Sequence, residues 1–313
     1  LEAGEVLRSG FFGSAASPTV VKADGLAAGK GVVVATSRGE AEQAVTELMS
    51  GGLVDPRAAN QIVLEQALEG IEASLLLFAD GRDYALMPVA RDHKRIGEND
   101  TGPNTGGMGA VTDPSILGTE MLERVVHEIV EPTLEGARAE GFPFRGVLFL
   151  GLMLTADGPR LLEYNVRFGD PETQAILVRL KTSLADILAA TRTVGLGNLK
   201  VEWADDSSVC VVMASEGYPA QYRTGLKIEG LEKVSPDKHV NVFHAGTSRS
   251  DKGEFLTAGG RVLGVTARGD SLEKALGRCY GAVEKINWEG MQYRRDIGKF
   301  RETPKAANRK STA

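Results

Sequence analysis

The chain has 313 residues, of which 42% are hydrophobic and 25% are charged, with a formal net charge of −6. These are ordinary values for a soluble chain of two or more domains, and the acidic balance argues against a nucleic-acid partner. No apolar run approaches the roughly 20 residues of a membrane-spanning helix, so we expect no membrane partner. The two cysteines, Cys210 and Cys279, lie in no metal or redox motif. We therefore expect a reducing compartment, the cytoplasm.

The chain opens without a methionine, on a helical pattern within residues 1–20, and we expect it to be part of a longer protein. Residues 21–34 then read V-K-A-D-G-L-A-A-G-K-G-V-V-V. Loops rich in glycine and lysine often surround phosphates with backbone N–H groups and an ammonium group. The P-loop spacing does not fit, because Gly31 stands where a hydroxyl belongs and a valine-rich strand follows. The pattern predicts a phosphate-binding hairpin, with a plain solvated turn as the alternative.

A helix and several strands are expected over the next sixty residues. Ser37 and Glu40 have capping-box spacing, so a helix should begin there and end at the glycines of 51–52. Strands are expected at 62–65, 72–78 and 84–89, the last two joined by a turn at Asp80-Gly81.

Residues 97–109 contain five glycines and little propensity for regular structure. Ordering so many glycines is unfavourable, so we interpret the stretch as a loop whose backbone approaches a ligand, with a flexible surface loop as the alternative. His93, just before it, is either catalytic or positional, and the pattern favours the second.

The remaining elements follow from periodicity. A helix is expected over 119–141 with a kink at Pro132, because proline lacks the N–H of a helical hydrogen bond. The other expected elements are a hairpin of 147–154 with 159–165, a helix over 171–188, strands at 209–213, 242–245 and 261–266, and a helix over 271–286.

The strand that ends in L-L-E-Y-N carries the clearest metal-binding pattern. Alternation places Glu163 and Asn165 on one face, and carboxylate and amide oxygens are ligands that Mg²⁺ or Mn²⁺ accepts. Arg167 would continue that face if the strand continues, and an acidic turn follows. The alternative is the polar face of an edge strand.

Four motifs together resemble one known family. They are K-A-D-G-L-A-A-G-K-G from residue 22, D-H-K-R from 92, D-T-G-P-N-T-G-G-M-G from 100 and E-Y-N-V-R-F-G-D-P-E-T-Q from 163. Further matches are G-Y-P-A-Q-Y-R-T-G at 217–225, F-H-A-G-T at 243–247 and G-G-R-V-L-G-V-T at 259–266. Jointly and in this order they resemble the phosphoribosylamine–glycine ligases (glycinamide ribonucleotide synthetases), which are ATP-grasp enzymes of purine biosynthesis.

The resemblance implies an α+β ATP-grasp fold, with two α+β subdomains that sandwich ATP, followed by a small C-terminal α+β domain. It implies ATP-dependent joining of glycine to 5-phosphoribosylamine through a glycyl phosphate, with Mg²⁺ or Mn²⁺ as cofactor and a monomeric enzyme. The implied division is a partial N-terminal linker or helix (1–20), a lid subdomain with the Gly-Lys hairpin and adenine hinge (21–90), a catalytic and metal subdomain (91–200), the C-terminal domain (206–300) and a disordered tail (303–313).

Site residues are carried over position by position as what the resemblance implies. The metal ligands are Glu163 and Asn165. Catalytic roles fall on Lys30, Arg167 and Asp170. The residues expected to bind the nucleotide are Lys22, Gly29, Lys30, Gly31, Glu65, Ala67 and Glu72. The residues expected to bind glycine and the acyl phosphate are Asp92, Asn104, Thr105, Gly106, Gly107, Met108, Arg167, Asp170, Pro171 and Glu172.

The sequence departs from the family's pattern in two places. Many ATP-grasp enzymes carry a further acidic metal ligand on the preceding strand, which here reads G-L-M-L over 151–154. The family's N-terminal Rossmann-like domain is also absent from this chain. The open alternatives are another ATP-grasp carboxylate–amine ligase and an ATP-binding fragment without turnover.

Overall fold

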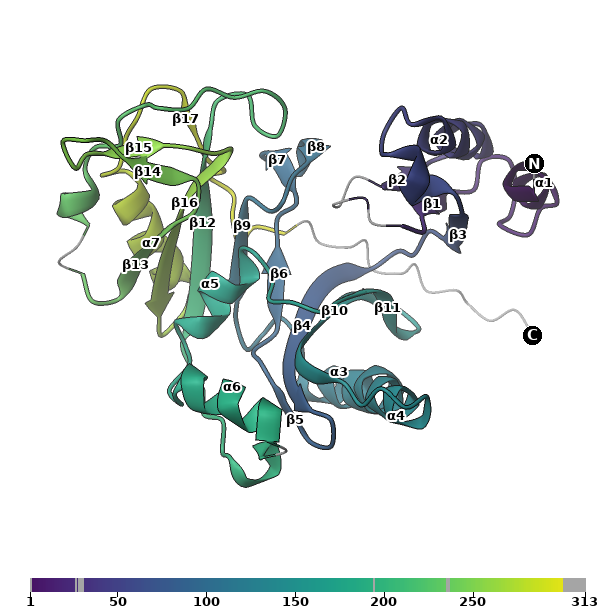
Figure 1. The fold of residues 1–313 in the computed structure, drawn as a ribbon, viewed down its shortest axis with the longest axis horizontal. Helices are drawn as coiled ribbons and strands as arrows, with labels where there is room; N and C mark the ends of the chain where they lie inside the picture. Colours follow the sequence, from purple (N-terminus) through teal and green to yellow (C-terminus); the bar gives the residue numbers. More distant parts are fainter. Residues whose placement is uncertain (1, 26, 28–30, 194, 235–236, 301–313) are drawn as a thin grey trace, which may run out of the picture. The chain divides into compact units, whose positions relative to one another are not determined.

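The computed structural model describes residues 2–25, 27, 31–193, 195–234 and 237–300 (Figure 1). The expected tail, 303–313, lies outside these residues. The chain divides into two compact units, Leu1–Glu69 (unit 1) and Gly70–Ala313 (unit 2). Every helix in the described part of the chain is too short or too polar to span a bilayer.

Unit 1 is a three-stranded antiparallel sheet with helices packed on one face. The strand order is β2 (Val32–Ala35), β1 (Thr19–Ala23), β3 (Ile62–Gln66), and the helices are α1 (Glu2–Arg8), α2 (Arg38–Ser50) and the 3₁₀ turn Pro56–Ala59. The core consists of Leu7, Val21, Ala35, Ala41, Ala44, Leu48 and Ala59.

The predicted helix in unit 1 is confirmed, and so are the signals that bound it. The hydroxyl of Ser37 accepts a hydrogen bond from the N–H of Glu40, and the Glu40 carboxylate accepts one from the N–H of Thr36. Gly51 ends the helix with φ +85°, a left-handed conformation that glycine adopts without strain.

Unit 2 is built around one ten-stranded sheet. Its main path runs β11-β10-β4-β6-β9-β12-β16-β13, with β5 added beside β4 and β17 beside β12. The strands are β4 (Ile71–Asp80), β5 (Tyr84–Leu86), β6 (Ala90–Asp92), β9 (Gly109–Thr112), β10 (Arg145–Thr155), β11 (Gly158–Asn165), β12 (Ser207–Ser215), β13 (Val240–His244), β16 (Arg261–Gly269) and β17 (Met291–Gln292). Two separate hairpins pair β7 (Arg95–Gly97) with β8 (Thr101–Asn104), and β14 (Thr247–Arg249) with β15 (Phe255–Thr257).

Both faces of this sheet are covered by helices. Leu75 and Leu77 of β4 pack with the α3–α4 helix, whereas Leu76 and Phe78 pack with α6 on the opposite face. A strand buried on both faces needs a continuous apolar run, which explains the sequence L-L-L-F at 75–78. The helices are α3 (Thr119–Val125), a π turn (Val126–Val130), α4 (Glu131–Ala139), α5 (Glu172–Leu177), α6 (Leu184–Thr193) and α7 (Leu272–Val283), with 3₁₀ turns at Leu196–Asn198 and Leu231–Lys233.

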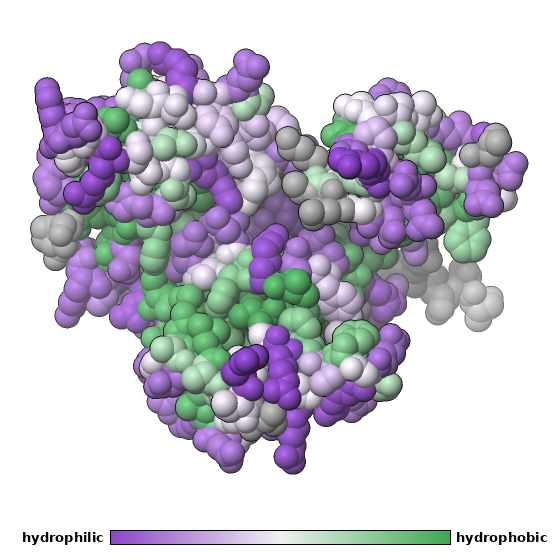
Figure 2. Space-filling view, viewed as in Figure 1, coloured by the Kyte–Doolittle hydropathy of each residue, from purple (hydrophilic) through white to green (hydrophobic). Residues whose placement is uncertain are grey.

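The surface in Figure 2 is mostly hydrophilic, and an apolar area lies over α5. The third core cluster, under α7, joins Val209 and Val211 of β12 to Val265 of β16 and Cys279 of α7. Both cysteines are buried and free. The C-terminal strands therefore extend the central sheet and bury a core of their own against one helix.

The sequence-based domain boundaries differ from this arrangement. Residue 90 lies inside unit 2, because β4 pairs with β10 along its whole length from Ile71. The expected division between 91–200 and 206–300 falls within one continuous sheet, because β9 pairs with β12 at Val111 and Val209. Long-range strand pairing of this kind leaves no local signal in the sequence.

Three expected elements also differ. The helix expected over 171–188 is two helices, because the backbone at Leu180 bridges to Trp203 and leaves the helical path. The helix over 119–141 accommodates Pro132 by the π turn that precedes it. Residues 97–109, expected to be irregular, contribute to β7, β8 and β9.

Candidate active site

Unit 1 presents an apolar sheet face on the side away from its helices. Val32, Val34 and Val63 are 41%, 63% and 38% exposed. Val32 and Val63 flank Lys22 in the strand register. The Nζ atom of Lys22 lies 2.6 Å from Oε2 of Glu65. Such a face offers apolar contact for a planar ring and an ammonium group for an anion.

The remaining predicted nucleotide residues of unit 1 lie around the ends of these strands. Gly31 directly precedes β2, and a Cβ atom there would lie 2.5 Å from the Cβ of Ala27, so the position needs glycine. Ala67 directly follows β3. Gly29 and Lys30 lie outside the described residues.

In unit 2, the two predicted metal ligands meet at the end of β11. The amide Nδ2 of Asn165 donates to Oε1 of Glu163 over 3.2 Å. Glu163 stands opposite Gly151 of β10, and the register shifts by one residue just after this pair. A Cβ atom on Gly151 would lie 3.0 Å from Cγ of Glu163. A β-bulge beside a polar pair often redirects a functional side chain.

The donor set at this place fits a magnesium or manganese ion in chemistry and in number. Two hard oxygen donors are adjacent, and Mg²⁺ is commonly held by one or two carboxylates together with substrate phosphates and waters. The described residues contain no cluster of three or more His, Cys, Asp or Glu side chains with metal-binding geometry. Gly151 accordingly leaves space where a further carboxylate would stand.

A group of charged side chains surrounds the neighbouring strands β4 and β6. Ser74 of β4 pairs with Gly151, which pairs with Glu163, so the three lie in one row across the sheet. The Oγ of Ser74 donates to Oε1 of Glu172 over 3.3 Å, and Glu172 is only 5% exposed.

Glu72, two residues before Ser74 on β4, pairs with the ammonium of Lys94 over 2.5 Å. Asp92, the last residue of β6, lies close enough to Lys94, Glu72 and Glu163 to influence their electrostatics.

These carboxylates titrate far from their ordinary range. Burial, with the charge of Asp92 next, raises the pKa of Glu172 to about 7. Burial also raises the pKa of Asp92. Burial lowers the pKa of Lys94, but the charges of Asp92 and Glu72 outweigh that effect and raise it above its ordinary value. The site therefore holds a permanent cation among acids, at least one of which is easily protonated.

The predicted substrate loop, 104–108, is internally hydrogen-bonded. Four successive amides donate within the protein: Thr105 to the Lys94 carbonyl (2.7 Å), Gly106 to Tyr218 Oη (3.0 Å), Gly107 to Thr105 Oγ1 (2.9 Å) and Met108 to the His93 carbonyl (2.8 Å). The expectation that this backbone is free to meet a ligand is therefore wrong for these four amides.

The glycines of this loop are explained by close packing. A Cβ atom on Gly107, whose φ is +109°, would lie 2.4 Å from Cδ of Pro171. A Cβ atom on Gly106 would lie 2.9 Å from Cζ of Arg261. The loop is thus fixed against the 168–172 turn and against strand β16.

Arg261, the first residue of β16, connects these parts. Its Nη1 donates to the carbonyls of Gly106 (2.6 Å) and Asp170 (2.9 Å), and its Nη2 lies 2.9 Å from Oδ2 of Asp170. The amide of Gly106 donates to Tyr218 on its other side. One guanidinium therefore anchors two of the predicted substrate segments.

Other predicted residues are placed differently from expectation. Strand β11 ends at Asn165, so Arg167 does not continue its face; the side chain is exposed and Nη1 donates to the Phe168 carbonyl over 2.9 Å. Asn104 is exposed at the end of β8. The carboxylate of Asp170 is held by Arg261 and by Gln174.

Sequence reasoning missed three residues of this site: Lys94, Tyr218 and Arg261. All three stand in motifs that resemble the family, so the motifs were a usable signal. Nothing local to residues 218 or 261 indicates that they contact residue 106, because the contact depends on the pairing of distant strands.

Comparison with known proteins decides the family. Residues 5–173 match the model of the phosphoribosylglycinamide synthetase ATP-grasp (A) domain, and residues 208–300 match that of the C domain of the same family. This chain belongs to the phosphoribosylglycinamide synthetase family.

Individual relatives agree. The chain is 47% identical over 282 residues to the phosphoribosylamine–glycine ligase of Agrobacterium fabrum, an alignment that covers 90% of this chain and 66% of that protein. The chain thus spans about two thirds of the length of the curated relatives that it matches. The solved phosphoribosylamine–glycine ligase of Thermotoga maritima is 36% identical with a TM-score of 0.82, covering 94% of this chain and 72% of that one.

More distant structures share the fold alone. The biotin carboxylase domain of the Hydrogenobacter thermophilus 2-oxoglutarate carboxylase, solved with MgADP and bicarbonate, is 15% identical with a TM-score of 0.65, covering 93% of this chain and 61% of that one. This family member accordingly has the α+β ATP-grasp fold followed by a C-terminal α+β domain, as the sequence predicts.

Proposed function

We propose that this chain, within its complete protein, joins glycine to 5-phosphoribosylamine at the expense of ATP, in purine biosynthesis. The products are glycinamide ribonucleotide, ADP and phosphate. The observation that carries the proposal is the Glu163–Asn165 oxygen pair beside an anchored substrate loop, in a chain of the phosphoribosylglycinamide synthetase family.

The reaction has two steps. A carboxylate oxygen of glycine attacks the γ-phosphorus of ATP, the bond to the β-phosphate oxygen breaks, and ADP leaves. The amine nitrogen of phosphoribosylamine then attacks the acyl carbon of glycyl phosphate, loses a proton and displaces phosphate. Both steps concentrate negative charge on phosphoryl oxygens, so fixed cations provide most of the catalysis.

Unit 1 is proposed to bind the nucleotide. Lys22 and Lys30 would neutralise phosphate charge, and Gly29 and Gly31 would allow the hairpin backbone to approach the phosphates. The exposed valines support binding of the adenine ring, with the backbone around Glu65 and Ala67 reading its edge.

Unit 2 is proposed to bind the metal and glycine. Glu163 and Asn165 would hold Mg²⁺ or Mn²⁺, which when bound neutralises phosphate charge. Glu72 would contact the ribose hydroxyls, and its ion pair with Lys94 sets the position of its carboxylate. Asp92 and Glu172 would receive the ammonium group of glycine, with Asn104, Thr105, Gly106, Gly107, Met108 and Pro171 forming the wall of the pocket.

The two remaining predicted catalytic residues of unit 2 have different proposed roles. The exposed guanidinium of Arg167 is available to a transferring phosphoryl group. Asp170 is held by Arg261 in this structure, so we propose that its carboxylate keeps the substrate loop in place. We further propose a monomer in the cytoplasm, with which two free buried cysteines are compatible.

The test is a coupled assay of ADP release with ATP, glycine and phosphoribosylamine, on this chain and on one extended upstream to the length of its relatives. We expect full turnover in the extended chain alone. Glu163→Gln keeps the size of the side chain but removes its charge, and should lower kcat/KM for Mg-ATP by roughly 100-fold or more. His127→Gln, at an exposed position of the π turn, is the control and should change it less than about twofold.

Release of ADP that depends on glycine but proceeds with a different amine would identify another ligase of this fold. Equal losses in Glu163→Gln and His127→Gln would remove the metal assignment. Comparable turnover of this chain and the extended chain would contradict the expected need for the upstream segment.

A further inference from the structure

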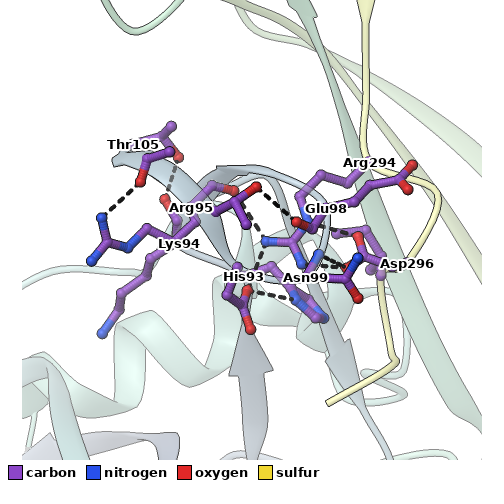
Figure 3. A network of polar contacts seen from close by, with 12 residues as sticks. His93, Lys94, Arg95, Glu98, Asn99, Thr105, Arg294 and Asp296 are labelled. Carbon is purple, nitrogen blue, oxygen red and sulfur yellow. Dashed lines mark hydrogen bonds and ion pairs between the residues drawn. The ribbon is translucent and has the colours of Figure 1, made fainter. Parts of the chain in front are cut away.

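A buried arginine near the end of the described chain binds the β7–β8 hairpin. Arg294 is 1% exposed and is the largest fully buried side chain among the described residues. Its Nε and Nη2 bind the two carboxylate oxygens of Asp296 at 2.8 and 2.7 Å. Its Nη1 binds Oδ1 of Asp100 at 2.8 Å and the carbonyl of Arg95 at 3.1 Å. Figure 3 shows Arg294 reaching between its own segment and the hairpin.

The whole segment 293–300, here called the C-terminal strap, contacts the same region. Phe300 stacks on His93 with ring centroids 4.4 Å apart, and the guanidinium of Arg91 lies 3.5 Å from the Phe300 ring centroid. Further strap contacts are the amide of Asn99 to Oδ2 of Asp296 (2.7 Å), the amide of Arg295 to Oε1 of Glu98 (3.2 Å) and the amide of Gly298 to Nε2 of His93 (2.9 Å).

His93 is thereby a neutral acceptor. Burial, with the charge of Arg294 next, lowers the pKa of His93 to about 4. Its Nε2 therefore carries a lone pair at neutral pH and accepts from Gly298. The positional interpretation of His93 fits this geometry.

The hairpin needs such support. Within the described residues, β7 and β8 pair only with each other, and an isolated two-stranded hairpin is at best marginally stable. Its turn holds Asn99 and Asp100 at φ +55° and +53°, a left-handed conformation that is unfavourable for most residues with side chains. The strap binds both turn residues directly.

The hairpin leads straight into the substrate loop. β8 ends at Asn104, and both the amide and the hydroxyl of Thr105 donate to the carbonyl of Lys94, which precedes β7. A movement of the hairpin would therefore move Asn104 and Lys94 together. A buried ion pair adds little net stability against an apolar pair, so its effect here is mainly on geometry.

We infer that Arg294 is a positioning residue for the glycine site, acting through Asp100 and the β7–β8 hairpin on the loop 104–108. The inference rests on the proposed function, because it assigns that loop to glycine. It concerns a residue that touches none of the reactants.

Asp100→Asn is the sharpest test, performed in the complete protein. It weakens the ion pair with Arg294 and leaves the Arg294–Asp296 pair intact, and asparagine tolerates the left-handed turn at least as well as aspartate. Asp100 is 41% exposed, so the variant should fold. Asp270→Asn, which removes an exposed ion pair with Lys274 (2.7 Å), is the matched control. The readouts are amide hydrogen exchange of 95–105 without substrates, and the KM values for glycine and for ATP.

We expect Asp100→Asn to speed exchange in 95–105 by roughly tenfold and to raise the KM for glycine by about tenfold, with the KM for ATP changed less than about twofold. Asp270→Asn should change none of these. Arg294→Lys, which retains the charge but loses the two-pronged geometry, should show the same pattern more strongly.

Unchanged exchange and an unchanged KM for glycine in Asp100→Asn would overturn the inference. Faster exchange with an unchanged KM for glycine would overturn it too, because the network would then serve stability alone. If the unsubstituted protein lacks glycine-dependent turnover, the proposed function fails, and the exchange measurement still reports whether the strap fixes the hairpin.

Discussion

Glu172 illustrates how a single residue carries information that only its surroundings reveal. The sequence places it in an acidic turn, where it reads as a solvated carboxylate or a ligand. In the structure it is 5% exposed, accepts a hydrogen bond from Ser74 and has a pKa raised to about 7 by burial. Between pH 4.5 and 7 the folded chain thus retains a proton that the unfolded chain has lost. The contribution of Glu172 to stability is therefore present at low pH and is lost as the pH rises through about 7.

Glu172→Gln should remove this dependence, because an amide does not ionise. The free energy of unfolding of the variant, relative to the unsubstituted chain, should increase from pH 5 to pH 8 by on the order of 3 kcal/mol. Urea unfolding at the two pH values measures the change. Glu123→Gln, at an exposed position of α3, is the control and should show no such increase. The same pH dependence in Glu172→Gln and the unsubstituted chain would show that the buried carboxylate stays ionised.

At the scale of elements, local signals predicted helix ends well and long-range strand pairing poorly. The cap at Ser37 and the left-handed Gly51 bound α2 as predicted, because both act within four residues. The 97–109 stretch was expected to be irregular, yet it forms parts of three strands whose partners lie elsewhere in the chain. Its glycines fit close neighbours such as Pro171 and Arg261.

Arg261, the first residue of β16, should be more important to the substrate loop than its sequence position indicates. Arg261→Gln would remove the bonds to the carbonyls of Gly106 and Asp170 and the ion pair with Asp170. We expect the KM for glycine to rise and the free energy of unfolding to fall by about 2 kcal/mol. Arg268→Gln, on the same strand but bonded to the Val178 carbonyl, is the matched control. A KM for glycine that responds equally to both substitutions would contradict the anchoring role.

At the scale of the whole molecule, the chain has separate cores. Unit 1 buries its own cluster around Leu48, and unit 2 buries three larger clusters against its ten-stranded sheet. The expected boundary at residue 90 placed β4 with unit 1, although the strand supplies buried residues on both faces of the sheet of unit 2.

Leu48→Ala tests this division. Leu48 is fully buried in α2, and its truncation should destabilise unit 1 by about 2–5 kcal/mol. Amide exchange should therefore accelerate in β1, β2, β3 and α2, while the strands β12 and β16 of unit 2 retain their protection. Equal acceleration in both groups of strands would mean that the two units unfold as one.

The sequence by itself determined the family, the α+β class, the local helix caps and the oxygen pair Glu163–Asn165. These depend on motifs, on alternation within one strand or on contacts a few residues apart. Only the tertiary structure decided that Arg261 and Tyr218 hold Gly106, that Arg294 holds the β7–β8 hairpin, and that Glu172 is buried. Those contacts join residues from 98 to 194 positions apart, or depend on which face of a sheet is covered, and neither property leaves a pattern in a short stretch of sequence.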